Sequence, residues 1–261
     1  MAEPSTILLR DDVDGIATLT LNRPDQRNAL SLGLMTALED QLDSIARDPS
    51  VKIVIIAGTG PAFCAGHDLR EVRADPRREA YEALFAQCSR LMLKIVRLAK
   101  PVIARVHGVA TAAGCQLVAS CDLAVAAHSA RFATPGVNIG LFCSTPMVAL
   151  SRAVPRKQAM EMLLTGDLIT ADQAREIGLI NRIVPAAELE SATLELARQI
   201  ASKSPLTLAI GKEAFYAQAE LNLEAAYAYA SGVMTRNMLA RDAAEGIDAF
   251  LAKRAPEWTG E

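Results

Sequence analysis

The chain has 261 residues, with 27 Lys or Arg against 30 Asp or Glu, a net charge of −3 and 51% hydrophobic residues. This balance excludes a disordered chain, and the slightly acidic charge disfavours nucleic acid as a partner. No apolar run reaches the ~18–20 residues that a membrane span needs. The first residues lack the patterns of a signal peptide and of a transit helix. We therefore expect a cytoplasmic protein.

The cysteines give no sign of a disulfide framework or a metal site. There are five of them, an odd number, and no two are spaced as a CxxC pair: Cys64, Cys88, Cys115, Cys121 and Cys143. A zinc site or a set of structural disulfides needs such pairing. We predict buried free thiols and no metal ion.

Strands and helices alternate in the first half of the chain. We predict a hairpin of strands 6–10 and 16–21 that turns at Asp14-Gly15, then a helix from about 31 to 47 and a strand at 51–57. A long helix at about 77–98 and strands at 102–106 and 123–127 follow. Continuous apolar strands separated by amphipathic helices indicate an α/β fold, with parallel strands covered by helices.

The second half is predominantly helical. Thr170-Ala171-Asp172-Gln173 is the pattern of a capping box, and it begins a helix that Gly178 ends. We predict a short strand at 179–184 and then helices at about 186–202, 205–219, 223–240 and 242–253. The last of these helices have little sequence around which to fold alone, so we expect them to pack on the first part of the chain or on another subunit.

Two loops of small residues each follow a buried strand. The first is GPAFCAGHDL at 60–69, and the second is HGVATAAGCQL at 107–117, which continues into a helix. Small residues let a backbone approach a ligand closely, and a helix N-terminus presents free N–H groups. Two such loops at neighbouring strand ends can direct two N–H groups at one oxygen, which is an oxyanion hole. Ordinary packing turns are the alternative.

Together with other segments, these loops resemble the crotonase superfamily, the enoyl-CoA hydratase/isomerase proteins. The combination of GHDL with ATAAGCQLVASCD is most similar to the branch of enoyl-CoA hydratase domain-containing proteins. The matching segments follow one another along nearly the whole chain: Asn22-Arg23-Pro24, Arg27-Asn28-Ala29-Leu30, Ala65-Gly66-His67-Asp68-Leu69, Ala113-Gly114-Cys115-Gln116-Leu117 and Glu245-Gly246-Ile247-Asp248-Ala249-Phe250.

The resemblance implies a fold, a ligand and an assembly. The fold is a spiral of ββα units with the acyl-CoA site in residues 1–200, followed by a helical oligomerisation segment at 201–261. The ligand is an acyl-CoA thioester, so coenzyme A enters as part of the substrate and no cofactor is bound permanently. The assembly is a homotrimer or a dimer of trimers.

The resemblance also implies roles for single residues. The amides of Ala65 and Ala113 are expected to hold the thioester oxygen, and Arg27 is placed to attract a phosphate of CoA. From its own spacing, independently of the family, Asp68 is expected to cap a helix in a capping box with Glu71, three residues later. The remaining expected CoA contacts are Ala29, Gly66, His67, Asp68, Leu69 and Gly114.

The sequence departs from the family at its acidic positions. Hydratases of the family use two glutamates, whose positions hold Gln116 and Gly136 here, and some relatives have an acid where this chain has Ser144. A glutamine can orient a water molecule but cannot remove its proton near neutral pH. Ser144 is a weak candidate nucleophile, with His67 as the only nearby base. We therefore expect little or no ordinary hydratase activity.

Three functions compete at this point. The first is an enoyl-CoA hydratase/isomerase-like enzyme, of the lyase class, in fatty-acid or related carboxylate metabolism. The second is a module that binds or sequesters acyl-CoA without turnover. The third is an RNA-binding relative, which the acidic pI disfavours.

Overall fold

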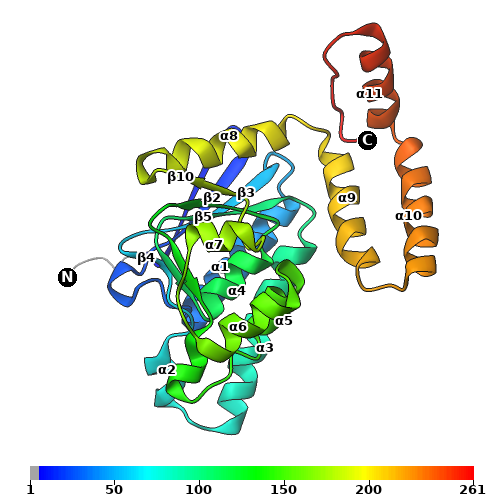
Figure 1. The fold of residues 1–261 in the computed structure, drawn as a ribbon. Helices are drawn as coiled ribbons and strands as arrows, with labels where there is room; N and C mark the ends of the chain where they lie inside the picture. The colour runs from blue at the N-terminus through cyan, green and yellow to red at the C-terminus, as the bar shows by residue number, and fades with distance from the viewer. Residues whose placement is uncertain (1–5) are drawn as a thin grey trace.

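The computed structural model describes residues 6–261 and contains two β-sheets surrounded by helices (Figure 1). The larger sheet has the strand order β1-β2-β3-β5-β7-β10, in which β1 and β2 are antiparallel and the other neighbours are parallel. Its strands are β1 (Leu8–Val13), β2 (Ile16–Leu21), β3 (Ile53–Gly58), β5 (Val102–Val106), β7 (Leu123–Ala127) and β10 (Arg182–Val184). The α/β prediction with parallel strands is confirmed.

A second, smaller sheet has the order β4-β6-β8-β9. Each of β3, β5 and β7 is followed by one short strand of this sheet and then by helix, so the chain repeats a ββα unit, as the crotonase resemblance implied. Sequence reasoning missed these strands because two or three residues are too few to show a periodicity. They are β4 (Ala62–Cys64), β6 (Val109–Thr111), β8 (Arg131–Ala133) and β9 (Ile169–Thr170).

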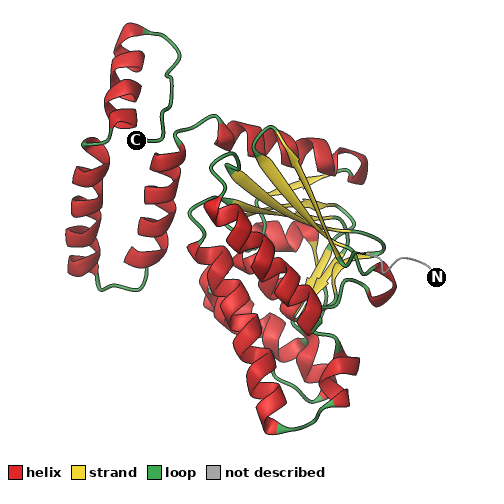
Figure 2. Ribbon diagram, turned by 180° about the vertical axis from the view of Figure 1, so that it is seen from behind, coloured by secondary structure: helices red, strands yellow, loops and turns green. Residues whose placement is uncertain are grey.

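Helices cover both faces of the larger sheet (Figure 2). On one face lie α1 (Leu32–Arg47), α3 (Arg78–Arg97) and α4 (Ala113–Ser120), and on the other lies α8 (Leu189–Ala201). Successive side chains of a strand point to opposite faces, so Val54 joins the core under α1 and Ile55 joins the core under α8. This double burial explains the unbroken apolar run of β3.

Side-chain caps mark the starts of several helices. Ser31 caps α1, and both halves of the predicted capping box form at Thr170 and Gln173. The other short helices are α2 (Leu69–Ala74), α5 (Pro146–Ala153), α6 (Arg156–Thr165) and α7 (Ala171–Glu176), with 3₁₀ turns η1 (Pro24–Gln26), η2 (Pro135–Ile139) and η3 (Ala186–Glu188).

The predicted capping box at Asp68 is wrong in its second half. Asp68 caps α2 by accepting the N–H of Arg70 at 3.1 Å, as expected. The carboxylate of Glu71 instead accepts the N–H of Leu32 at 2.9 Å, which is the first residue of α1. Tertiary proximity of the two helix starts therefore overrides the local motif.

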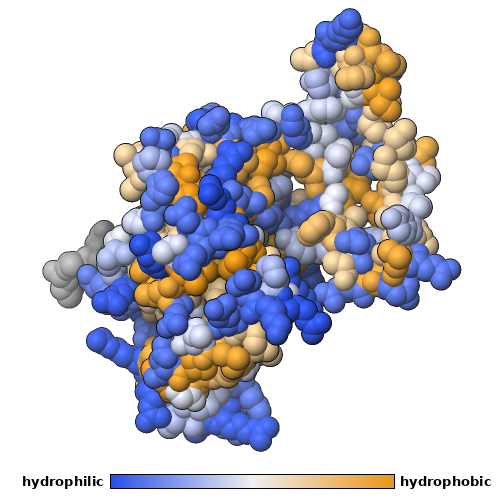
Figure 3. All heavy atoms as spheres, in the orientation of Figure 1, coloured by the Kyte–Doolittle hydropathy of each residue, from blue (hydrophilic) through white to orange (hydrophobic). Residues whose placement is uncertain are grey.

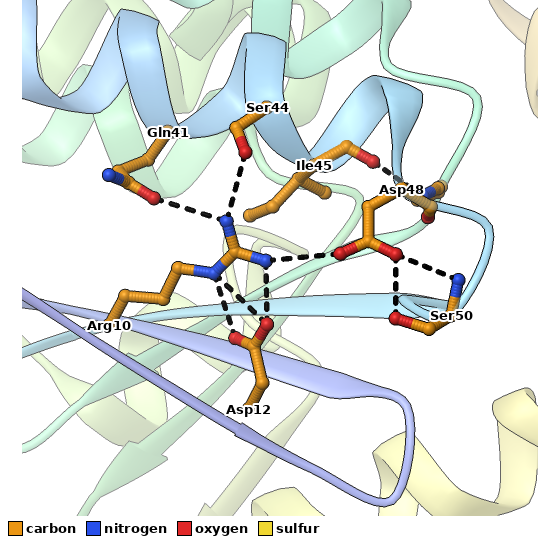
Figure 4. A network of polar contacts seen from close by, with 8 residues as sticks. Arg10, Asp12, Gln41, Ser44, Ile45, Asp48 and Ser50 are labelled. Carbon is orange, nitrogen blue, oxygen red and sulfur yellow. Dashed lines mark hydrogen bonds and ion pairs between the residues drawn. The ribbon is translucent and has the colours of Figure 1, made fainter.

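The edge of the larger sheet is tied to α1 by a polar network (Figure 4). The guanidinium of Arg10 on β1 bonds the carboxylate of Asp12 at 2.6 Å and also contacts Gln41 and Ser44 of α1. Asp48, just after α1, lies 3.6 Å from the same guanidinium. The strand containing Arg10 runs from Leu8 to Val13, later than the predicted 6–10.

The last helices, which we call the C-terminal helices, project away from the sheets (Figures 1 and 2). They are α9 (Pro205–Gln218), α10 (Leu223–Met238) and α11 (Arg241–Ala252). Neither α9 nor α10 buries a side chain fully, and apolar surface is visible along this part of the molecule in Figure 3. No helix within residues 6–261 combines the length and the apolar character required to cross a bilayer.

Candidate active site

The two small-residue loops meet at the start of α4. Strands β4 and β6 are parallel neighbours, so the segments that follow them emerge at the same edge of the smaller sheet. The hydroxyl of Thr111 donates to the carbonyl oxygen of Ala65 at 3.2 Å. A Cβ built on Gly66 would lie 2.9 Å from Cβ of Ala112 and 3.4 Å from the amide nitrogen of Ala113. The structure thus brings the predicted pair of loops into contact.

Only one of the two predicted amide donors is available. Ala113 is the first residue of α4, and its N–H has no acceptor among residues 6–261. The N–H of Ala65 donates to the carbonyl oxygen of Arg27 at 3.1 Å, so we correct this prediction: the amide of Ala65 is already used. The N–H of His67 has no acceptor in the described part of the chain. His67 therefore replaces Ala65 as the second free donor.

The imidazole of His67 is enclosed beside this donor pair. Neither ring nitrogen has a hydrogen-bond partner among the described residues, and the ring meets Phe85 of α3 edge-on, with centroids 5.9 Å apart. Burial lowers the pKa of His67, so the ring is neutral near pH 7. The hydroxyl of Ser144 donates to the carbonyl of Phe142 at 3.3 Å and forms no hydrogen bond with His67. The weak candidate pair of Ser144 and His67 is therefore not formed.

A buried asparagine holds the first loop in place. Asn28 has a left-handed φ of 53° and is fully buried. Its amide group donates to the carbonyls of Thr59 and Ala62, each at 2.8 Å, and its oxygen accepts the N–H of Arg23 at 2.8 Å. The guanidinium of Arg23 pairs with Asp68 at 2.9 Å. Sequence reasoning assigned these residues to the family motif but did not find this network, because its partners are distant in sequence.

The predicted CoA contacts lie around this scaffold. Arg27 is exposed, with its backbone at φ 50°, and its guanidinium has no partner in the described residues. The carboxylate of Asp68 is already paired with Arg23, which leaves its backbone for a ligand. Leu69 is half exposed, and Ala29 is buried. Gly114 packs so tightly on the carbonyl of Cys64 that no side chain would fit.

The positions of the missing glutamates are buried. Gln116 lies on α4, and its carboxamide oxygen accepts a weak hydrogen bond from the thiol of Cys88 at 3.7 Å. Gly136 lies in η2, where a Cβ would overlap the carbonyl oxygen of Leu141 and lie 2.9 Å from Sγ of Cys143. A glutamate at 136 would therefore require the loop to move. Gln116 also lines a cavity of about 1710 Å³ between α3, α5 and the C-terminal helices.

The cysteines around these loops are buried thiols. All five are free and buried, as predicted. Burial raises the pKa of Cys64, Cys88 and Cys115 to about 12 each. These groups therefore stay protonated, and thiolate chemistry at neutral pH is excluded for them. Within residues 6–261 no group of three His, Cys, Asp or Glu side chains is arranged to hold a metal ion.

Comparisons with known proteins agree with this geometry. The family model for "Enoyl-CoA hydratase/isomerase" matches residues 11–261. The human protein "Enoyl-CoA hydratase domain-containing protein 3, mitochondrial" is 49% identical over 95% of this chain and 82% of its own length. The "2,3-dehydroadipyl-CoA hydratase" of Escherichia coli is 35% identical over 94% of this chain and 95% of its own. A crystal structure of an enoyl-CoA hydratase from Mycobacterium smegmatis superposes with a TM-score of 0.95, at 54% identity, over 97% of this chain and 99% of that one.

One expectation is contradicted by these findings. The human, mouse and rat relatives, 48–49% identical to this chain, are all named mitochondrial, so the predicted cytoplasmic location is wrong. Charge and terminal sequence were poor guides to the compartment. The match over almost the entire chain, the ββα spiral and the paired loops agree, and the chain belongs to the enoyl-CoA hydratase/isomerase family, the crotonase superfamily.

Proposed function

We propose that this protein binds acyl-CoA thioesters and holds the thioester oxygen between the amides of His67 and Ala113. The observation that carries the proposal is the pair of unused N–H groups on two loops in direct contact. Free N–H groups in a largely buried position lower the energy of an oxygen that gains negative charge. The positive end of α4 adds to this effect at Ala113.

The surroundings support an acyl thioester as the ligand. Arg27 is exposed beside the first loop and can pair with a phosphate of CoA. The cavity next to Gln116 is mostly apolar, with side chains such as Met92, Val148 and Ile210 on its wall. An acyl chain that extends from the oxyanion hole past Gln116 would enter it. No metal or resident cofactor is required for this binding mode.

We infer that addition of water to an enoyl-CoA is slow. Gln116, Gly136 and Ser144 supply no carboxylate, and each missing acid or base typically costs ~10²–10⁴ in rate. The oxyanion hole alone favours reactions in which an enolate forms at the thioester. An enoyl-CoA hydratase/isomerase-like enzyme of low hydratase activity is therefore our first choice. The empty acid positions also favour the alternative, an acyl-CoA binding or sequestering protein without turnover.

The donor pair can be tested by removing one N–H. The substitution Ala113→Pro deletes a donor at the first position of α4, where the helix itself uses no N–H. The residue before a proline favours an extended backbone, so Ala112 must leave its positive φ in this variant. We expect affinity for crotonyl-CoA to fall while affinity for CoA alone changes little, and any turnover to drop by ~10²–10³. Calorimetric titration and the loss of enoyl-thioester absorbance measure these quantities.

A matched control is Arg78→Pro, the same change at the first residue of α3, which follows an extended N-cap. It should leave crotonyl-CoA binding unchanged. Equal affinity of wild type and Ala113→Pro for crotonyl-CoA, with folding verified by circular dichroism, would contradict the oxyanion hole. Rapid hydration by the wild type would contradict the inferred loss of the acids and would reveal an unidentified acid–base pair.

We also propose that the C-terminal helices form the contacts of a homotrimer or a dimer of trimers. Leu223, Tyr227, Met234 and Met238 form an apolar stripe along α10, and each is at least half exposed. Phe250 of α11 is 82% exposed. Apolar surface of this kind on one element indicates a protein–protein contact.

A further inference from the structure

The two free amides share a backbone feature. Each follows a residue with positive φ: Gly66, at φ +97°, precedes His67, and Ala112, at φ +50°, precedes Ala113. For glycine this conformation is ordinary. The ψ of Ala112 is −118°, so this alanine lies outside the left-handed region that a residue with a side chain can occupy. Ala112 is therefore strained at the point where the second donor is presented.

The neighbours of Ala112 hold it in this conformation. Its N–H donates to the carbonyl of Ala133 on β8, and its carbonyl accepts the N–H of Gln116, each at 3.0 Å. Its methyl group packs over Gly66, whose own Cβ would lie only 2.9 Å away. Bonds to a strand and to a helix, together with packing on the other loop, leave no room for relaxation. Strain of this kind persists when the surroundings determine it from several sides.

Comparison with other helix starts in this chain shows what the strain achieves. Ser31 and Thr170 cap α1 and α7 with ψ of 162° and 166°, and their side-chain oxygens accept an N–H of the first turn. Ala112 has neither the extended ψ nor a side-chain acceptor. The different ψ turns the peptide plane that contains the N–H of Ala113. The missing side-chain oxygen leaves the first-turn amides without a protein partner.

We propose that Ala112 is a positioning residue of the oxyanion hole, whose strained backbone aims the amide of Ala113 and whose methyl group sets the spacing to the His67 loop. This inference rests on the proposed function. It implies that the chain gives up folding stability at residue 112 in order to hold the donor in place. A glycine at this position would make the folded protein more stable, but it would direct the amide of Ala113 less well.

The test is Ala112→Gly, compared with Ala119→Gly inside the same helix. We expect the urea midpoint to rise for Ala112→Gly, because strain is removed, and to fall for Ala119→Gly, because glycine weakens a helix interior. Cinnamoyl-CoA serves as a probe of the amide donor. A hydrogen bond to its thioester carbonyl polarises that group and moves the absorbance of the bound cinnamoyl-CoA to longer wavelength. We expect a smaller shift for Ala112→Gly and an affinity lower by roughly tenfold, as for a weakened hydrogen bond.

The outcomes separate this inference from the proposed function. A wild-type complex without an absorbance shift would show that no oxyanion hole acts on the carbonyl, and the proposed function would fail. A wild-type shift that Ala112→Gly retains in full would leave the proposed function standing and overturn the inference. The inference would also be overturned if Ala112→Gly lowered the urea midpoint as Ala119→Gly does, or failed to fold.

A second pair of variants tests the spacing. Gly66→Ala places a methyl group against that of Ala112 and is expected to lower both the urea midpoint and the absorbance shift. Adding Ala112→Gly to Gly66→Ala should restore part of both losses, because one of the two opposed methyl groups is gone. Strictly additive effects on the absorbance shift would overturn the role of the Ala112 methyl group.

Discussion

Helices of similar length are used differently in the two parts of this molecule. In the spiral, six of the 20 residues of α3 are buried, whereas no residue is buried as a whole among the 14 of α9 and the 16 of α10. The apolar residues of α3 pack in one core with α1 and α4, while the apolar stripe of α10 remains more than half exposed within the described chain. The difference supports the proposed assembly, because the apolar side chains that the C-terminal helices leave exposed are available for a contact with another subunit.

The two regions are joined by one buried polar cluster. Lys212 of α9 reaches the core and donates to Asp122 at 2.7 Å and to the carbonyls of Ile95 and Lys100 at 3.0 Å each. The hydroxyl of Tyr216 donates to the same carboxylate at 2.9 Å. Burial lowers the pKa of Lys212, and the charge of Asp122 opposes this change. This cluster fixes the direction in which the C-terminal helices leave the spiral.

The largest effect should come from breaking that junction. Lys212→Met leaves the carboxylate of Asp122 without its cation in a mostly buried site, which typically costs about 3–5 kcal/mol. We expect a free energy of unfolding lower by that amount in urea titrations. Lys203→Met, at an exposed lysine just before α9, is the control and should change it by less than about 0.5 kcal/mol. Equal effects of the two substitutions would show that the ion pair does not hold the regions together.

A substitution in α10 is expected to have a smaller effect on folding and a clear effect on assembly. Tyr227→Asp places a charge on the exposed apolar stripe, where the side chain is 70% exposed. We expect the mass measured by light scattering to fall toward that of a monomer, because a charge buried at a contact without a partner is unfavourable. Val13→Asp, at an exposed apolar residue of β1, is the control and should retain the assembly. A wild-type monomer at micromolar concentration would contradict the proposed trimer.

The smallest effect concerns the pH dependence of the spiral. Burial lowers the pKa of His67, so the unfolded state binds its proton more readily than the folded state does. Stability is therefore lost as pH falls below about 6.5, with a slope of at most about 1.4 kcal/mol per pH unit for one histidine. His67→Gln should make the unfolding free energy decline less between pH 7 and 5, and above pH 7.5 the two slopes should agree. An unchanged slope below pH 6.5 would mean that the ring is not held neutral by burial.

Much of the fold was predictable because its signals are local. The apolar runs of β5 and β7 gave their bounds without error, and the caps at Ser31 and Thr170 marked two helix starts. Periodicity over many residues makes such elements visible. The strands of the smaller sheet were not predictable, because three residues such as Ala62–Cys64 carry no periodic pattern.

The site was predictable in part. Small residues after two strands, together with the family motifs, located both loops and the unpaired amide of Ala113. They did not show that the amide of Ala65 donates to the carbonyl of Arg27 and that the amide of His67 is unpaired instead. Hydrogen bonds between segments distant in sequence decide which backbone groups stay free, and composition does not record them.

The sequence by itself thus determined the family, the order along the chain of the larger sheet's strands and of the long helices, the absence of carboxylates at positions 116, 136 and 144, and the two loops that would meet. These properties depend on residue type and local pattern. Only the tertiary structure decided which amides remain unpaired. It also placed Leu141 where a side chain at position 136 would overlap it, and it holds Ala112 in a strained conformation between Ala133 and Gly66. The reason is physical: close packing and shared hydrogen bonds are properties of segments brought together, and neither exists before the chain has folded.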